Sequence, residues 1–427
     1  MSFVNAQTSF ETLLQRRERA FASTYTSFYA EPLEIVRADD VWMYDSTGKA
    51  YLDFYNNVPV VGHCNPTVAT RVFNQLTQVN THTRYLTRNI IELSERLLSK
   101  VPAPLDRIIF TCTGSESNDL AYRIAKSVTD NEGFIVTSNA YHGGTAALVE
   151  LSPSLCGIEG VGSNTFLASG IGEMPGKFIE SVRAALVSME GRGIKPAAIF
   201  LDSAFSSDGI HTHLGSELKI ATELVRAAGG LVVADEVQSG FHRFGTTMWG
   251  FQHHGFEPDL ITLGKPMGNG YPIAAVIGNS EIFDAFCKKS LYFNTFAGGN
   301  VAAEAALAVL DIIERDELAK NSSAVGEELR NGLIQLKNRF ALIKEVRGEG
   351  LFFGVELQEF GAHQASQNIG VLVVEDLKVR GILVSATGVS NNVLKIRPPL
   401  TIKSSHVSYF LERLEESLTN HCREKVE

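Results

Sequence analysis

The amino-acid sequence predicts an α/β protein, with a large, mainly parallel sheet covered by helices and a smaller α+β part. The first observation is a set of five short apolar runs that alternate with helical patterns. Uninterrupted apolar runs are typical of strands buried on both faces of a sheet, and their alternation with helices indicates a layered α/β domain. The runs are Arg107–Thr111, Gly133–Thr137, Ala197–Asp202, Leu231–Asp235 and Leu260–Leu263.

The second observation is the pattern between and around these runs. Helical stretches at Ser117–Ser127 and Glu217–Ala228 supply the alternation with strands. Before the first run, the stretch PLEIVRADDVWMYDSTGKAYLDF has the pattern of a hairpin with a turn at Asp45–Gly48. We therefore expect the N-terminal segment to form strands of its own.

The third observation is a change of pattern near Val301. Residues 302–340 form one long amphipathic helical region, RGEGLFFGVEL (347–357) follows as a strand, and Ser404–Thr419 is a last amphipathic helix. We expect three parts: residues 1–55 as a segment joining a small domain, 56–300 as the large domain, and 301–427 as the small domain.

Composition and charge limit the classes of function. The 427 residues are 44% hydrophobic and 20% charged, and their net charge is −10. This composition predicts a globular protein, and its acidic surface disfavours nucleic acid and anionic membranes as partners. No apolar run reaches the roughly 18 residues of a membrane span, and the polar N-terminus carries Glu11, unlike a signal or transit peptide. Five scattered cysteines without a CxxC pair indicate no disulfide framework, so we expect the cytoplasm.

Three features lie at the carboxyl ends of the apolar runs, where open α/β sheets bind their ligands. Lys265 follows LITLG, Asp235 ends LVVAD, and Gly114–Ser115 follows IIFTCT and opens a helix. Each alone is more often a solvated lysine, a helix cap or a turn. Together they match pyridoxal phosphate, which needs a lysine to bind its aldehyde, a carboxylate for its ring nitrogen and a helix N-terminus for its phosphate. Tyr141 and His142, after the next strand, offer rings for its face.

Motifs for other ligands, namely nucleotides, dinucleotides and metal ions, are incomplete in this sequence. A P-loop ending at Lys265 would need glycine and a hydroxyl residue at positions occupied by Asp259 and Pro266, and a dinucleotide fingerprint at Gly348 ends on Phe353. His211-Thr212-His213 and His253-His254 lack a third ligand at suitable spacing, so no metal site is expected.

At this point the motifs resemble the class III aminotransferase family, enzymes of fold type I that use pyridoxal phosphate. The most specific segment is LVVADEVQSGFHRFG, followed by Lys265 in TLGKPMGNGYPIAAV. The resemblance covers nearly the whole chain. It implies a homodimer with shared active sites, or a tetramer built from it. The implied roles are covalent attachment at Lys265, ring-nitrogen pairing at Asp235, a place near the phenolic oxygen for Gln238, phosphate binding by Gly114 and Ser115, ring contact by Tyr141, and contact of Thr295 with the neighbouring subunit's phosphate.

Departures from the common pattern bear on the reaction. Asp202 stands where the family usually has Glu, and Lys395, with Arg397 nearby, stands where many members have the arginine that grips a substrate α-carboxylate. A lysine cannot make the bidentate contact that selects a carboxylate. Segments such as FYNNVPVVGHCNP, VNTHTRYL and VLKIRPP resemble the phospholyase branch of the family, although TFAGGNVA departs from it.

The leading hypothesis is therefore a lyase that eliminates phosphate from a small aminoalkyl phosphate, or a related phosphonate. The candidate substrate residues are Asn57, His82, Thr83, Arg84, Lys395 and Arg397. An aminotransferase that moves the amino group of an ω-amine or amino acid to pyruvate uses the same lysine and aspartate and stays open. A non-catalytic binding protein on the same fold is the third hypothesis, disfavoured by the intact Lys265 and Asp235.

Overall fold

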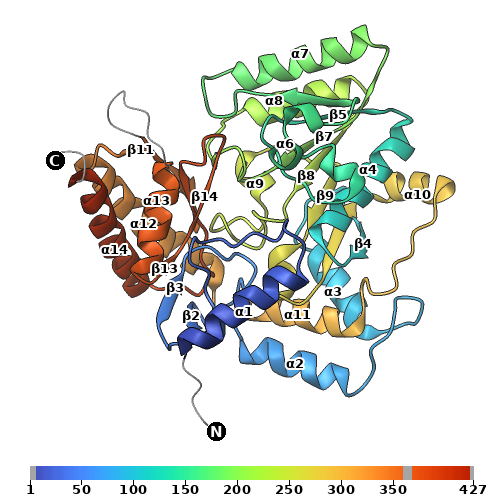
Figure 1. Cartoon of the computed structure of the whole chain (residues 1–427). Helices are drawn as coiled ribbons and strands as arrows, with labels where there is room; N and C mark the ends of the chain where they lie inside the picture. Colours follow the sequence, from blue (N-terminus) through green and yellow to red (C-terminus); the bar gives the residue numbers. More distant parts are fainter. Residues whose placement is uncertain (1–5, 359–367, 424–427) are drawn as a thin grey trace.

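A seven-stranded sheet forms the centre of the computed structural model, which describes residues 6–358 and 368–423 (Figure 1). The five predicted runs are all strands of this sheet. β9, β8, β7, β5 and β6 are parallel, which confirms the mainly parallel sheet. In spatial order the strands are β4 (Arg107–Thr111), β10 (Ala274–Gly278), β9 (Leu260–Leu263), β8 (Leu231–Asp235), β7 (Pro196–Asp202), β5 (Gly133–Thr137) and β6 (Thr165–Ala168).

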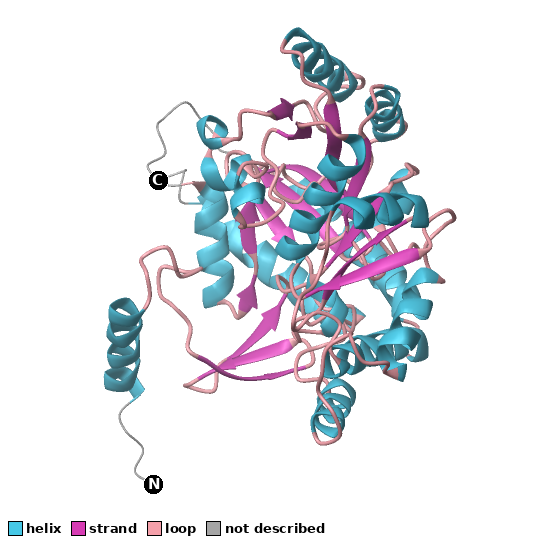
Figure 2. Cartoon of the chain, turned by 90° about the vertical axis from the view of Figure 1, so that its right-hand side faces the viewer, coloured by secondary structure: helices cyan, strands magenta, loops and turns pink. Residues whose placement is uncertain are grey.

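Helices cover both faces of this sheet, as its uninterrupted apolar strands require. Successive residues of one strand enter different cores: Phe134 and Val136 pack with α4 and α10, whereas Ile135 packs in the core that α7, α8 and α11 share. Figure 2 shows the strands passing between the two helical layers. The bounds of the helices are α4 (Gly114–Thr129), α7 (Lys177–Gly191), α8 (Glu217–Ala227), α10 (Ser280–Lys289) and α11 (Asn300–Arg315).

The N-terminal hairpin was predicted correctly. β2 (Trp42–Asp45) pairs antiparallel with β3 (Ala50–Asp53), and Gly48 adopts a φ of 87° in the turn. β1 (Ile35–Asp39) extends the sheet on one side, and β13 (Ile382–Leu383) from the C-terminal part pairs in parallel with β3 on the other. The preceding helix, α1 (Ala6–Ala20), stands apart from the body of the protein in Figure 2.

Two predictions in the C-terminal part were too coarse. The single helical region is two helices, because the chain turns at Glu317, whose φ is 50°, between α11 and α12 (Leu318–Arg339). The single strand is a hairpin of β11 (Ile343–Glu349) and β12 (Phe352–Leu357), which reverses at Gly350 with a φ of 55°. The last predicted helix is present as α14 (Ser404–Arg423), and α13 (Ile369–Val379) packs beside it.

β11 and β12 belong to a third sheet, with the order β11-β12-β15-β14, where β14 is Ser385–Thr387 and β15 is Val393–Ile396. The remaining elements are α2 (Pro66–Leu76), α3 (Arg88–Leu98), α5 (Ala146–Val149), α6 (Pro153–Cys156), η1 (Ile158–Gly160), α9 (Gly250–His254) and η2 (Lys265–Gly268). The division at residues 55 and 300 stays a prediction, and residues 1–5, 359–367 and 424–427 of its outer parts lie outside the described residues. None of the described helices has the length and apolarity of a membrane span.

Candidate active site

The ends of β4, β8 and β9 enclose a cavity of about 210 Å³. Seven of the eight residues expected to hold the cofactor line it, and Thr295 does not. Its lining consists of Thr113, Gly114, Ser115, Asn118, Tyr141, His142, Gly143, Asp235, Val237, Gln238 and Lys265. The strand ends therefore bring together residues that lie up to 152 positions apart, from Thr113 to Lys265.

The N-terminus of α4 opens on this cavity. Thr113 caps the helix, its hydroxyl accepting from the Glu116 N–H at 3.1 Å, and the Glu116 carboxylate accepts from the Thr113 N–H in return. This capping box leaves the N–H groups of Gly114 and Ser115 without intrahelical acceptors, next to the positive end of the helix dipole. The two residues thus form a site for an anion, with the Ser115 hydroxyl beside them.

Glycines make room for close approach at this end of the cavity. A Cβ on Gly114 would lie 2.8 Å from both methyl groups of Val237, and one on Gly264 would lie 3.1 Å from the Gly114 Cα. Gly143 has a φ of 145°, and a Cβ there would lie 2.8 Å from the Ser115 hydroxyl. Alanine at any of these positions would crowd the anion site.

Asp235 is buried and held by three neighbours. Its Oδ2 accepts from the Asn118 amide and lies 2.8 Å from the His142 Nδ1, while its Oδ1 accepts from the Val237 N–H. Asn118 is fixed in turn by the Thr262 hydroxyl at 2.6 Å. The buried His142 Nε2 has no partner among the described residues. This carboxylate is oriented rather than free, and Asn118 is a residue that sequence patterns missed.

Lys265 begins η2 directly after β9, with its side chain in the cavity. Burial, and secondly the neighbouring Arg397, lower the pKa of its amine from the usual value. A lowered pKa leaves more of the lysine as the neutral nucleophile that imine chemistry requires.

Two further cations lie near Lys265. Burial lowers the pKa of Arg397, and it lowers the pKa of Lys395 well below its usual value. The charges of Arg397 and Lys265 lower the pKa of Lys395 further. Arg397 donates to the Gln238 Oε1 and lies over the Tyr55 ring at 4.7 Å, while its Nε has no described partner. No salt bridge to a carboxylate involves Lys395 or Arg397 in residues 6–358 and 368–423.

A chain of hydrogen bonds connects Arg397, through Gln238, to Asp202. The Gln238 amide donates to the Ser206 hydroxyl, which donates to the Asp202 carboxylate. Asp202 also accepts the N–H groups of Ala204 and Ser206, so its carboxylate is used in a local turn. Asp202, at the position where the family usually has Glu, therefore positions Gln238 through Ser206.

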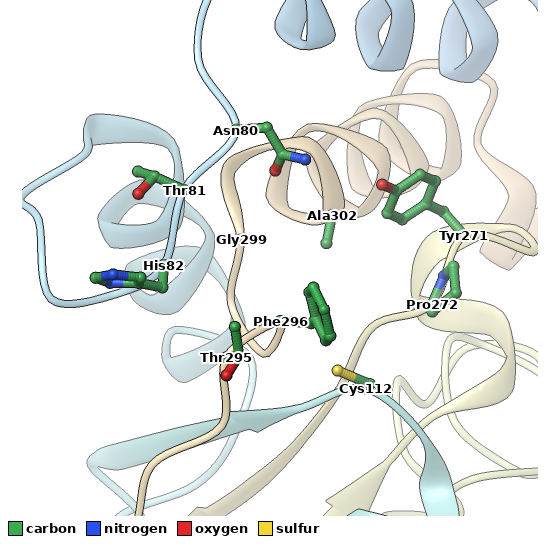
Figure 3. Close-up of a pocket in the computed structure, with 10 residues that line it drawn as sticks. All are labelled: Asn80, Thr81, His82, Cys112, Tyr271, Pro272, Thr295, Phe296, Gly299 and Ala302. Carbon is green, nitrogen blue, oxygen red and sulfur yellow. The ribbon is translucent and has the colours of Figure 1, made fainter.

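The other predicted substrate residues divide into two groups. Asn57 is buried and its amide donates to the Gln238 carbonyl at 3.2 Å, next to the cavity. His82 and Thr295 line a different cavity of about 530 Å³ (Figure 3). Thr83 and Arg84 lie exposed beside it, with Arg84 over the Phe293 ring at 4.0 Å. The single chain does not bring this second group to Lys265.

Comparison with known proteins places these features in a family. A model of the class III aminotransferases matches residues 25–418. The chain belongs to the class III aminotransferase family. Members of this family use pyridoxal phosphate, and the glycine-lined anion site, the oriented carboxylate and the buried lysine fit that cofactor.

Relatives named as phospho-lyases and relatives named as aminotransferases both match nearly the whole chain. Ethanolamine-phosphate phospho-lyase homolog 1 of Caenorhabditis elegans is 33% identical over 96% of this chain and 93% of its own. Human mitochondrial alanine–glyoxylate aminotransferase 2 is 29% identical over 98% and 88%. Among solved structures, a phospholyase from Arthrobacter in complex with phosphoethanolamine has a TM-score of 0.91, with 41% identity over 95% of this chain and 99% of that one.

Proposed function

We propose that this protein is a pyridoxal-phosphate-dependent phospholyase that eliminates phosphate from phosphoethanolamine or a similar small aminoalkyl phosphate. The observation that carries the proposal is the pair of half-buried Lys395 and buried Arg397, which lie near Lys265 without a carboxylate in a salt bridge to either among the described residues. The similarity to the Arthrobacter phospholyase, at 41% identity, supports the same substrate class.

The energetics of the cation pair favour a phosphate. Buried charges are costly unless they are paired, and these two also repel each other. A phosphate monoester carries close to two negative charges and several acceptor oxygens near neutral pH, so it offsets both cations at once. A substrate carboxylate would bring only one charge, and Lys395 lacks the planar fork that selects it.

The cofactor would be held by the residues of the 210 Å³ cavity. Lys265 would bind it covalently, Gly114 and Ser115 would bind its phosphate, and Tyr141 and His142 would contact its ring. When bound, pyridoxal phosphate supplies an aldehyde that condenses with amines and a ring that accepts the electron pair of a broken C–H bond. Asp235 would keep a proton on the ring nitrogen, because Asn118 and His142 orient its carboxylate.

Different residues would carry out the two steps of the elimination, proton removal and departure of the phosphate. Lys265 would be released as a free amine when the substrate amine takes its place. Because burial lowers its pKa, this amine would then accept the proton from the carbon that carries the substrate amine. The C–O bond then breaks, and the phosphate leaves with its electron pair toward Lys395 and Arg397. Gln238, which Ser206 and Asn57 fix, holds Arg397 in place for this step.

We also propose a homodimer, in which Thr295 reaches the cofactor phosphate of the neighbouring subunit. Thr295 lies outside its own subunit's cofactor cavity, in a region of exposed apolar side chains. Leu86 is 95% exposed, Leu291 92% and Phe296 79%, and exposed apolar patches of this kind mark protein interfaces. His82, Thr83 and Arg84 would join the active site through the same interface. Assembly to a tetramer stays a prediction.

The five cysteines are all free thiols, which supports the reducing cytoplasm as the proposed location.

An ω-amine or amino acid:pyruvate aminotransferase is the second candidate, favoured by the human relative's name. The two reactions separate in a steady-state assay with phosphoethanolamine and no oxoacid, followed by alanine with an oxoacid such as glyoxylate or pyruvate. We expect release of inorganic phosphate in the first assay at a higher kcat/KM than amino transfer in the second. Efficient amino transfer without phosphate release would refute the phospholyase.

A further inference from the structure

The loop that follows β7, residues 203–211, contains two bulky residues in the left-handed backbone region. Phe205 has a φ of 48° and Ile210 a φ of 67°. A β-branched residue rarely adopts such a φ, and strained conformations persist only where the surrounding structure holds them. The same loop carries Ser206, whose hydroxyl accepts from the Gln238 amide at the active site. The contacts that hold this loop in shape therefore bear on the active site.

The loop is held between two sheets. On the side of the seven-stranded sheet, the Thr137 hydroxyl donates to the Asp208 Oδ2 at 2.7 Å, and the Asn139 N–H donates to the Asp208 Oδ1 at 3.2 Å. On the other side lies the third sheet, where the hydroxyl of Thr387 on β14 donates to the Ser206 carbonyl oxygen at 2.7 Å. Among the described residues, no other group donates to this buried carbonyl.

Arg347, on β11 of the third sheet, holds the end of the loop. Its Nη2 donates to the Gly209 carbonyl at 2.9 Å, and its Nε donates to the Ile210 carbonyl at 3.0 Å. A planar guanidinium offers several donors in a fixed geometry, so one side chain fixes two successive carbonyl groups of the strained turn. Thr387 and Arg347 therefore grip the loop at two separate points.

The register of the third sheet places this grip in line with Lys395. Arg347 pairs with Gly354 across β11 and β12, and Gly354 pairs with Lys395 across β12 and β15. Directly paired residues of antiparallel strands point to the same face, so Arg347 and Lys395 share one face with Gly354 between them. A Cβ on Gly354 would lie 3.0 Å from the Ile210 Cβ and 3.2 Å from the Gly209 carbonyl oxygen. Glycine at this position thus lets the loop lie directly on the face that carries Lys395.

We propose that Thr387 and Arg347 are positioning residues of the active site. They dock loop 203–211 on the third sheet and thereby align Gln238 with Arg397. Arg397 directly follows β15 of the third sheet, whereas Gln238 follows β8 of the seven-stranded sheet, so their hydrogen bond crosses from one sheet to the other. Its geometry depends on how the loop between the sheets is seated. This inference rests on the proposed function, in which Arg397 binds the leaving phosphate.

The test compares Thr387→Val with Thr387→Ser in the cofactor-loaded enzyme. Valine nearly keeps the shape of threonine but lacks the hydroxyl, whereas serine keeps it. Thr387→Val is expected to raise the KM for phosphoethanolamine and the inhibition constant of inorganic phosphate about five- to tenfold, with the absorbance of the bound cofactor unchanged. Thr387→Ser is expected to recover most of this loss. Thr165→Val, which removes a hydroxyl bond to the Glu150 carbonyl at 2.9 Å on the edge strand β6, is the matched control and is expected to change neither constant.

Two further variants change the docking of the loop without touching Thr387. Gly354→Ala removes no hydrogen bond but crowds the Ile210 side chain, and Arg347→Lys keeps the charge but loses the planar group that binds two carbonyls. Each is expected to raise the same two constants about two- to fivefold. Thermal midpoints are measured for every variant, because a purely structural role would lower the midpoint and leave both constants unchanged. That outcome would contradict a positioning role.

A double-mutant cycle tests the route of the effect. Ser206→Ala removes the hydroxyl that connects Gln238 to Asp202 but keeps the backbone carbonyl that Thr387 binds. Because both changes act through the same loop, Thr387→Val in the Ser206→Ala protein is expected to raise the constants less than twofold further. Full multiplication of the two effects would overturn the proposal, as would an effect of Thr387→Val no larger than that of Thr165→Val.

Failure of the proposed function would give a different result. The wild type would then release no phosphate from phosphoethanolamine and would transfer amino groups from alanine to pyruvate. The same cycle of Thr387→Val and Ser206→Ala, measured as the KM for alanine, still tests the docking of the loop. Coupled effects of the two substitutions would support the positioning role, and independent effects would overturn it.

Discussion

Substitution of Lys395 by methionine is expected to remove most phosphate elimination while leaving the fold intact. Methionine has nearly the length of lysine but carries no charge. The lost interaction is one charge-assisted hydrogen bond to the leaving phosphate, worth about 1.5–3 kcal/mol. This corresponds to a fall of about 10- to 150-fold in kcat/KM for phosphoethanolamine, measured as release of inorganic phosphate.

Although Lys395→Met is expected to lower activity, it is expected to stabilise the folded protein. The folded state lowers the pKa of Lys395, so its charged form weakens the fold. This destabilisation is complete below the folded pKa and fades as pH rises toward the unfolded value near 10.5. Lys395→Met is therefore expected to have an equal or higher free energy of unfolding at low and neutral pH, with the difference shrinking in alkali. Urea denaturation at several pH values measures it.

Lys344→Met is the matched control, because Lys344 lies on β11 of the same sheet, separated from β15 by β12, and its exposed side chain pairs with Glu356. We expect it to leave kcat/KM unchanged. If Lys395→Met keeps kcat/KM within about threefold of the wild type, or if it unfolds the protein, the assignment of Lys395 to the phosphate fails.

Three further outcomes follow from the site. Asp235→Asn is expected to lower kcat about 100-fold or more, seen in the phosphate assay, with circular dichroism unchanged. Gly114→Ala places a Cβ 2.8 Å from the Val237 methyl groups, so affinity for pyridoxal phosphate in equilibrium dialysis is expected to fall about tenfold. Phe296→Asp introduces a charge at the exposed apolar region and is expected to yield inactive monomers in sedimentation; an active dimer would contradict the shared site.

The fold was predictable where residue pattern alone decides structure. The runs at β4, β5, β7, β8 and β9 are uninterrupted and apolar, and each is a strand. β6 and β10 were missed because TFLA is short and AAVIG is rich in alanine, which disfavours neither helix nor strand strongly. The antiparallel direction of β10 depends on tertiary pairing with β4 and β9, which no local pattern encodes.

The candidate site was predictable to the same extent. Lys265, Asp235 and Gly114 stand at strand ends, so the topology of an open sheet brings them together. The neighbours that orient them carry no such signal. Asn118 lies in the middle of a helical pattern, and the chain from Asp202 through Ser206 to Gln238 joins residues whose contact appears only in the folded protein.

The central claim is tested most directly by counting phosphate molecules released per cofactor-loaded Lys265. The purified holoenzyme is mixed with excess phosphoethanolamine and no oxoacid, and both inorganic phosphate and the visible absorbance of the cofactor are followed. Elimination restores the enzyme after each turnover, so many equivalents of phosphate are expected, with the absorbance of the lysine-bound cofactor returning at the end. Conversion to the pyridoxamine absorbance without phosphate release, reversed by pyruvate, would contradict this account.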